Sequence, residues 1–172
     1  HSPDGRRQIV GLSSPDALLA GLQTLNEEQH QYSAVAATEV SACKLRHRAL
    51  LTSVKSGSEI AVRLVSAINS QLAHSRALMR VLGHRCAAAK IASFIRIVVP
   101  ASQHDNERYT LPFSRSEIAD MLGLSEETVC RQMARLKRRG ILYAPRGRIE
   151  VHDWSQLKAI ADESPVQEGL VA

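Results

Sequence analysis

Aromatic residues are scarce in this chain, where Phe, Trp and Tyr make up 3% of 172 residues. Hydrophobic residues still account for 44% of the sequence, enough for one domain or two small ones with aliphatic cores. No apolar run is long enough to span a membrane. Residues 1–20 are polar and charged, so no signal peptide is expected. The low aromatic content favours packed helices rich in Leu, Ile, Val and Ala.

Metal-binding and catalytic patterns are also missing. The three cysteines, Cys43, Cys86 and Cys130, lie far apart and form neither a C-x-x-C pair nor a disulfide framework, so a reducing cytoplasm is the default compartment. The seven histidines show no metal-ligand spacing. No nucleophile, base and acid stand out as a set. The sequence therefore predicts no catalytic residue, no metal and no cofactor.

Positive charge is in excess and unevenly placed. The net charge is +5 and the isoelectric point is near 9.4, which suits a polyanionic partner. Residues 131–148 hold seven basic residues and no acidic one, although such a run on an isolated helix is also typical of a solvated face. Tyr143 is the only aromatic residue there, which argues against a base-stacking surface for single strands. The basic residues are Arg131, Arg135, Lys137, Arg138, Arg139, Arg146 and Arg148.

The stretch SEETVCRQMARLKRRG is expected to form a helix. Val129, Met133 and Leu136 recur with helical spacing. Ser125 is a good N-cap, acidic residues follow it in the first turn, and basic residues fill the last turn, as the helix dipole favours. Gly140 suits the position just beyond the helix.

A second helix is expected just before this one. Ser114 and Glu117 form an S-x-x-E capping box, and Gly123 ends the helix. Two helices joined by so short a turn form a helix-turn-helix unit, whose second helix would enter the major groove of DNA. The apolar face of the first helix consists of Ile118, Met121 and Leu122.

Downstream, apolar residues alternate on both sides of Pro145-Arg146-Gly147, which predicts a β-hairpin with a basic turn. Helix, turn, helix and hairpin together make a winged helix-turn-helix. The alternating residues are Ile141, Tyr143, Ile149 and Val151.

The longest helical pattern runs from Ser58 to Leu82. Its apolar stripe, flanked by polar residues, suits pairing with a second helix, although burial within its own domain is an alternative. A shorter helix from Cys86 to Val99 follows and ends at Pro100, and residues 101–109 are expected to be a polar loop. The residues expected to pair two subunits are Ile60, Leu64, Ile68, Leu72 and Leu78. The inward residues of the shorter helix are Ile91, Phe94, Ile95 and Val98.

The first third of the chain is expected to be rich in strands. Asp4-Gly5 predicts a hairpin turn followed by a strand, and residues 32–45 alternate enough for one or two more. Three leucines between them, at positions 18, 19 and 22, suggest a helical turn or loop. These strands are too few to close a sheet alone.

This order of elements, with SRSEIADMLGLSEETVCRQMARLKRRGIL, resembles the CRP/FNR superfamily of bacterial transcription regulators, in particular its FNR-like nitrogen-fixation and anaerobic branch. DGRRQIVGL and AAAKIASFI resemble a barrel strand and the helix after the dimerisation helix, and the likeness is strongest from Ile91 to Val151. It implies an α+β fold whose sensor barrel begins before His1. The implied domains are the second half of a cyclic-nucleotide-binding-like β-roll (residues 1–53), a dimerisation helix (54–83), a winged helix-turn-helix (84–162) and a tail (163–172).

The resemblance also implies roles for single residues. FNR-like members carry E-x-x-S-R in the second helix and read a TTGAT-like half-site; the matching positions are Glu127, Cys130 and Arg131. Glu127 would accept from cytosine N4, and Arg131 would donate to guanine O6 and N7. The implied partners are double-stranded DNA, a second copy of the chain and RNA polymerase. Contacts to the DNA backbone are expected from Ser114, Ser125, Thr128, Arg135, Arg138, Arg146 and Arg148.

Cys130 stands where the family has serine, and two interpretations are open. It is a small residue tolerated there, or it is a redox switch. The helix N-terminus and the nearby Arg131 and Arg135 favour a reactive thiolate, while Glu126 and Glu127 oppose it. Oxidation to a sulfinic or sulfonic acid would add negative charge facing the DNA.

Two departures from the family concern ligands. Its cyclic-nucleotide binders carry a Gly-Glu pair and then an Arg-Ser element, and neither Pro15-Asp16-Ala17-Leu18 nor residues 31–37 match them. A cyclic nucleotide is therefore not expected. Cys43 falls where iron–sulfur members place their last cluster ligand, but a buried structural cysteine is the favoured interpretation.

The sequence thus predicts a cytoplasmic, homodimeric, sequence-specific DNA-binding transcription regulator that is not an enzyme. One alternative is a protein-interaction scaffold that keeps the winged helix without specific DNA binding; the basic run argues against it. Another is an enzyme with a fused regulatory module, for which no catalytic constellation is present.

Overall fold

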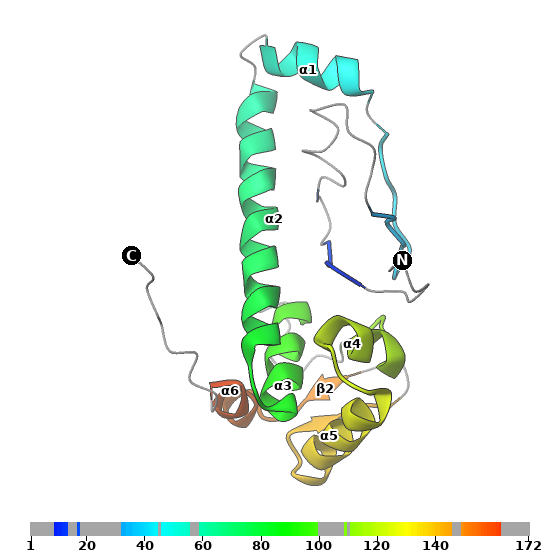
Figure 1. Cartoon of the computed structure of the whole chain (residues 1–172), viewed down its shortest axis with the longest axis vertical. Coiled ribbons are helices and arrows are strands. Elements are labelled where there is room, and N and C mark those ends of the chain that lie inside the picture. The colour runs from blue at the N-terminus through cyan, green and yellow to red at the C-terminus, as the bar shows by residue number, and fades with distance from the viewer. Residues whose placement is uncertain are drawn as a thin grey trace. The chain divides into compact units, whose positions relative to one another are not determined.

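The computed structural model describes residues 9–13, 17, 32–44, 46–55, 59–99, 109, 111–145 and 149–162. By its internal contacts the chain divides into two compact units. Residues 12–75 make the N-terminal unit, and residues 1–11 with 76–172 make the C-terminal unit. The elements in order are α1 (His47–Lys55), α2 (Glu59–Gly83), α3 (Ala87–Val98), α4 (Arg115–Leu122), α5 (Glu126–Arg138), β1 (Leu142–Tyr143), β2 (Glu150–Val151) and α6 (Trp154–Asp162) (Figure 1). Among the described helices, none is long and apolar enough to cross a lipid bilayer.

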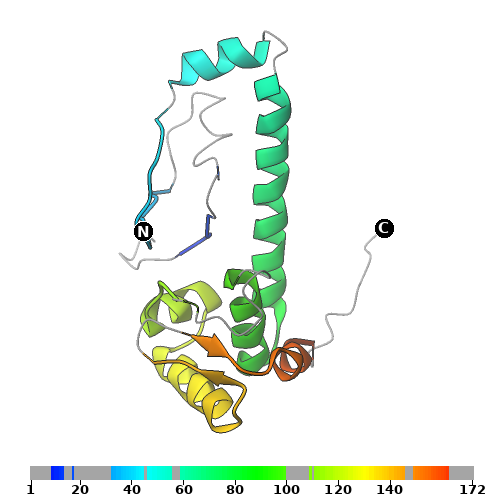
Figure 2. The ribbon, with the colours of Figure 1, turned by 180° about the vertical axis from the view of Figure 1, so that it is seen from behind.

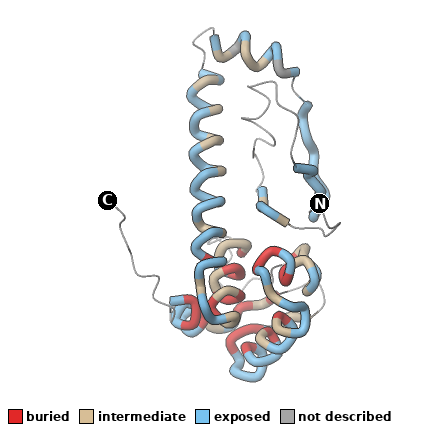
Figure 3. Tube along the Cα trace, in the orientation of Figure 1, coloured by how far each residue is buried: buried red, intermediate tan, exposed pale blue. Residues whose placement is uncertain are grey.

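Helix α3 is central to the core of the C-terminal unit. Ile91, Phe94 and Ile95 are fully buried, because α3 packs against both α6 and α5. The rings of Phe94 and Phe113 lie 6.2 Å apart at 58°, a tilted geometry that aromatic pairs favour. The buried residues of the described chain gather in α3 to α6 and the strands, as Figure 3 shows. The helix predicted from Cys86 to Val99 is confirmed.

The helix-turn-helix begins and ends where the sequence predicts. The Ser114 hydroxyl accepts from the Glu117 N–H at 3.1 Å, and the Glu117 carboxylate accepts from the Ser114 N–H at 2.9 Å, which closes the capping box. Gly123 ends α4 with a φ of 61°, a left-handed conformation that glycine adopts at the lowest cost. Ser125 then caps α5 by accepting from the Thr128 N–H at 3.2 Å. These caps fix the turn between the two helices.

The wing is a short antiparallel pair. Leu142 pairs with Val151, and Tyr143 pairs with Glu150. Strand β1 lies against α5 (Figure 2). Of the predicted basic turn Pro145-Arg146-Gly147, Arg146 and Gly147 lie outside the described residues. The described part of the hairpin therefore has a ladder of two residue pairs.

Two features of this unit escape the sequence analysis. The backbone N–H and C=O of Tyr109 both pair with Ile149, so the prediction of a polar loop is wrong at this residue. Helix α6 follows Asp153, whose carboxylate accepts from the Gln156 N–H at 2.8 Å. The first feature joins residues 40 positions apart, whereas the second is a local cap at the start of α6.

The N-terminal unit differs from the strand-rich prediction. Residues 32–44 form no paired strand with any described residue, and a strand without a partner is not stable. All of residues 32–44 are exposed. The prediction of a buried Cys43 is therefore wrong, because no described element covers it.

Helix α1 is an element that the sequence analysis does not predict, and it contains residues 54 and 55, which were assigned to the dimerisation helix. The long helix itself is confirmed as α2. Three predictions lie outside the described residues: the turn at Asp4-Gly5, the leucines at positions 18, 19 and 22, and the tail from residue 163.

Candidate nucleic-acid interface

Helix α5 has one buried face and one exposed face. Val129, Met133 and Leu136 point into the core, as their spacing predicts. The opposite side consists of charged and small residues in contact with solvent. Its exposed members are Glu127, Cys130, Arg131, Arg135 and Arg138. The residues assigned to base edges therefore lie together on the open side of one well-anchored helix.

Glu127 and Arg131 form an ion pair along this face. Glu127 Oε1 and Arg131 Nη1 lie 3.5 Å apart, one helical turn from each other. The two side chains are 85% and 63% exposed, and a pair so open contributes about 0–1 kcal/mol. Either group can leave the pair at little cost. The helix thus presents a carboxylate acceptor beside a guanidinium donor, the groups that recognise cytosine and guanine edges.

The hydroxyls at the starts of α4 and α5 are already engaged. Ser114 Oγ donates to the Glu117 carboxylate at 3.0 Å, so a phosphate would compete with Glu117 for that proton. Ser125 Oγ and Thr128 Oγ1 lie 2.8 Å apart, and either can be the donor. One of these two hydroxyl protons is left for another acceptor. Of the two helix N-termini, that of α5 therefore has a spare hydroxyl donor for a phosphate, and that of α4 does not.

A pocket of about 200 Å³ opens beside Cys130. Arg115 Nη2, from the first turn of α4, donates to the Ala144 carbonyl at 3.2 Å. Burial lowers the pKa of Arg115. The pocket is lined by Arg115, Cys130, Met133, Ala134, Lys137 and Ala144.

Arg115 could not be recognised from the sequence, because its partner lies 29 residues further along the chain. Lys137 was recognisable only by its charge. In the structure, Lys137 Nζ lies 4.8 Å from the centre of the Tyr143 ring, within cation–π distance. Neither contact has a signal in local spacing.

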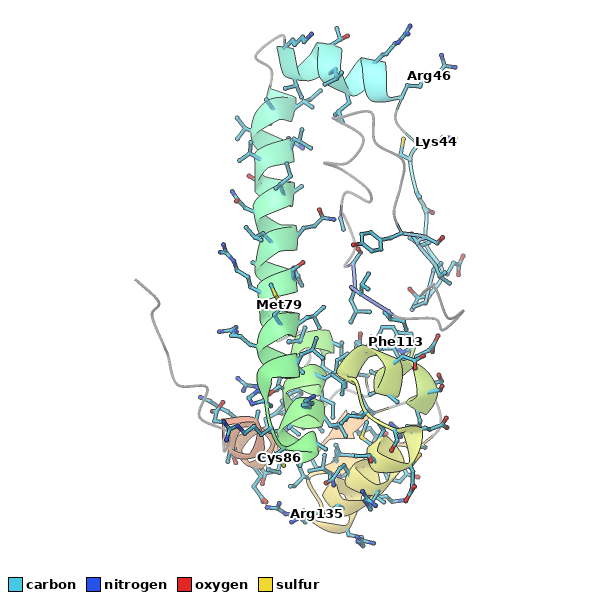
Figure 4. All side chains as sticks on the ribbon, in the orientation of Figure 1. Lys44, Arg46, Met79, Cys86, Phe113 and Arg135 are labelled. Atoms are coloured by element: carbon cyan, nitrogen blue, oxygen red, sulfur yellow. The ribbon has the colours of Figure 1, made fainter. Side chains whose placement is uncertain are left out.

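The C-terminal half of α5 carries further basic residues of the site. Arg135 extends from α5 into solvent (Figure 4), and Arg138 is also exposed in the last turn. The other two arginines predicted to contact the DNA backbone, Arg146 and Arg148, lie outside the described residues. Within the described part of the chain, no cluster of three or more His, Cys, Asp or Glu side chains is arranged to hold a metal.

Helix α2 carries an exposed apolar face. Val65, Leu72 and Met79 repeat every seven residues and are 58%, 44% and 59% exposed. Ile68 and Leu82 fall three residues after the first and third of these, and the polar Ser75 stands in the corresponding place after Leu72. The face thus follows a heptad pattern of the coiled-coil type with one polar position. Figure 4 shows Met79 on the outer surface of the helix.

The five residues predicted to pair two subunits divide into two groups by exposure. Ile60 and Leu72 are each 44% exposed. Leu64, Ile68 and Leu78 are partly buried within this chain. The sequence leaves two interpretations of this stripe, pairing with a second helix or burial in its own domain, and the intermediate exposure of the second group fits either of them.

Residues 89–160 match the Crp-like helix-turn-helix domain. The nitrogen fixation regulation protein FixK of Bradyrhizobium diazoefficiens is 33% identical over 162 residues, which are 92% of this chain and 67% of the relative. The transcriptional activator protein FnrL of Cereibacter sphaeroides is 33% identical over 148 residues, which are 81% of this chain and 58% of the relative. The chain thus spans about three fifths to two thirds of these relatives' length.

The chain is also similar to a solved structure, that of FixK2 from Bradyrhizobium japonicum, with a TM-score of 0.57 and 26% identity. The match covers 67% of this chain and 59% of that protein.

Proposed function

The chain belongs to the CRP/FNR family, and on that premise we propose that it is a sequence-specific transcription regulator that binds double-stranded DNA. The observation that carries the proposal is the open face of α5, where Glu127, Cys130 and Arg131 lie side by side above a buried apolar face. A capped helix of this kind fits the major groove, and its N-terminal residues meet the base edges.

Base reading is assigned to the Glu127–Arg131 pair. On binding, the exposed ion pair opens: Arg131 donates to O6 and N7 of a guanine, and Glu127 accepts from N4 of a cytosine. Each group exchanges a weak surface partner for a base in a desolvated groove. The expected half-site is TTGAT-like, as in the FNR-like branch, with Cys130 in the place of the third contact.

Contacts to the phosphates supply affinity without sequence information. The exposed Arg135 and Arg138 extend from α5 on the side of the base-reading residues. Ser125 and Thr128 share a spare hydroxyl proton at the N-terminus of that helix, where anions are favoured. The full set of proposed backbone contacts is Ser114, Ser125, Thr128, Arg135, Arg138, Arg146 and Arg148.

Pairing of two copies through α2 would bring two recognition helices to one DNA site. The exposed heptad face supports a seam that includes Val65, Ile68, Leu72 and Met79, beside the Ile60, Leu64 and Leu78 expected from the sequence. A two-fold dimer reads an inverted repeat whose half-sites lie one helical turn apart. Family membership extends the proposal to RNA polymerase as a partner and to the cytoplasm as the compartment.

A selection from random duplex DNA tests the function. The proposal expects recovered sequences to contain an inverted TTGAT-like repeat, and binding of the pool to weaken steeply with salt because counterions are released from the phosphates. Recovery of no common sequence would instead favour the winged-helix scaffold without specific DNA binding.

Redox control through Cys130 is a second part of the proposal. The thiol is free and exposed on the DNA-facing side of α5, so an acidic oxidation product there would repel DNA without unfolding the protein. Peroxide is expected to abolish binding by the parent, and Cys130→Ser is expected to bind DNA and resist peroxide. If Cys130→Ser is inactivated as fast as the parent, the sensitive thiol lies elsewhere; Cys43 and Cys86 are also exposed.

A further inference from the structure

The hairpin of the wing has few hydrogen-bonded residue pairs of its own among the described residues. Its described ladder consists of two residue pairs, and an isolated two-stranded hairpin is marginal in water. On the outer side of β2, Tyr109 adds a single bridge at Ile149. Strand β1 therefore depends on contacts from the helices beside it.

Arg115 supplies the first of these contacts. Its Nη2 donates at 3.2 Å to the carbonyl of Ala144, the residue that follows β1 on the way to the turn. The contact is partly buried, and burial lowers the pKa of Arg115. Hydrogen bonds from a charged donor are shorter and stronger than neutral ones. The first turn of α4 is thus tied directly to the end of β1 nearer the turn of the wing.

Lys137 supplies the second contact, from the last turn of α5. Its ammonium lies 4.8 Å from the centre of the Tyr143 ring. Tyr143 and Ala144 are adjacent, so two cations from the two helices of the helix-turn-helix hold consecutive residues of one strand end. Arg115 and Lys137 also line the same pocket.

We infer that Arg115 is a positioning residue that sets the wing against the recognition helix, and that it contributes to DNA binding through the wing. A guanidinium has five donors in a rigid fork, so one side chain can hold the Ala144 carbonyl while it packs over α5. The DNA part of this inference rests on the proposed function. The structural part does not, because it concerns the free protein.

Amide hydrogen exchange of the free protein tests the structural part. Arg115→Met keeps an unbranched apolar chain and removes the donors, and we expect the amides of β1 and β2 to exchange about tenfold faster. The amides of Ile91 and Ile95 in α3 should be unchanged. Arg139→Met is the matched control, since it removes an equally basic but exposed side chain and should leave the hairpin as in the parent.

Equal hairpin exchange in the parent and in Arg115→Met would overturn the inference. If Arg115→Met does not fold, as judged by loss of protection in α3, Arg115→Lys takes its place. It keeps the charge but not the fork, and hairpin exchange should still exceed that of the parent; exchange equal to that of the parent would again overturn the inference.

A double-mutant cycle on operator DNA tests the functional part. If Arg115 acts through the wing, Arg146→Ala should weaken binding less in the Arg115→Met background than in the parent. Arg138→Ala, on the recognition helix, should cost the same factor in both backgrounds. Additive effects of Arg115 and Arg146 would mean that Arg115 does not act through the wing. Faster hairpin exchange in a protein that binds no DNA at all would contradict the proposed function and leave the structural role intact.

Discussion

The two units of the chain differ in where their apolar side chains go. The C-terminal unit buries Phe94, Ile118 and Leu157 completely within its own helices and strands. In the N-terminal unit, Val35 is 73% exposed and Val65 is 58% exposed. Figure 3 shows the contrast as red segments in one unit and pale blue segments in the other.

The difference shows that the units obtain stability in different ways. The described residues of the C-terminal unit close a core by themselves, so its fold depends on internal packing. On α2, Val65, Leu72 and Met79 are exposed to solvent, so this apolar face would gain stability from a partner surface that covers it. We propose a second copy of α2 as that surface, because a heptad pattern can pair with its own copy.

The largest expected effect is on the core of the C-terminal unit. Phe94→Ala removes a buried ring that packs against Phe113 and should lower the free energy of unfolding by about 3–5 kcal/mol. Val35→Ala, in the N-terminal unit, should change it by less than about 0.5 kcal/mol because the side chain is exposed. Urea denaturation followed by circular dichroism measures both. Similar decreases in the free energy of unfolding for the two variants would contradict the proposed difference between the units.

Charged residues introduced on the exposed apolar face of α2 should prevent dimer formation and leave the core of the C-terminal unit intact. The double substitution Ile68→Glu and Leu72→Glu is expected to give monomers and to weaken operator binding about 100-fold or more, because the two half-sites are then bound separately. Ser70→Glu, which is exposed on the side of the helix opposite the heptad face, should leave both unchanged. Sedimentation velocity gives the mass, and a dimeric double variant would place the pairing surface elsewhere.

A smaller effect is expected from single contacts in the groove. Arg131→Ala should cost about 1–3 kcal/mol at the operator and relax the preference at the guanine position. Arg146→Ala should weaken binding to all sequences nearly equally, because phosphate contacts carry no sequence information. Binding-site selection with each variant separates the two roles. Identical preferences in both variants would mean that Arg131 does not read a base.

The smallest effect concerns the start of α6. The Gln156 N–H, then the Ser155 hydroxyl and the Gln156 side chain, donate to the Asp153 carboxylate and lower its pKa from the ordinary 3.8. Since the folded pKa lies below the unfolded one, this stabilisation is present above pH 3.8 and is lost as the pH falls through the folded pKa. The melting temperature of the parent should therefore exceed that of Asp153→Asn near neutral pH, and the gap should narrow in acid. A gap that is constant down to about pH 2 contradicts this account of the cap.

Local signals predicted the helix-turn-helix well. The capping residues lie within one or two turns of the groups they cap, so their spacing in the sequence was enough to predict where each helix begins or ends. These residues are Ser114, Glu117, Gly123 and Ser125. Helical periodicity likewise gave the buried face of α5 and hence the exposed side that faces the proposed DNA.

Contacts between distant residues could not be predicted in this way. Tyr109 pairs with Ile149, and Arg115 reaches Ala144, and neither pair has a periodic pattern that links it. The alternation of residues 32–45 suggested strands, but alternation does not supply the neighbouring backbone that a strand needs. The exposure of single side chains on α2 likewise could not be predicted without the structure. It adds the exposed Val65 and Met79 to the pairing surface expected from the sequence.

Titration of the protein with two duplexes over a range of salt concentrations tests the central claim most directly. One duplex carries the inverted TTGAT-like repeat, and the other carries the same bases in scrambled order. The account predicts that the repeat binds at least about 1,000-fold more tightly than the scrambled duplex at physiological salt, and that both affinities fall steeply as salt rises. Equal affinity for the two duplexes, or binding that does not respond to salt, would contradict sequence-specific DNA recognition by α5.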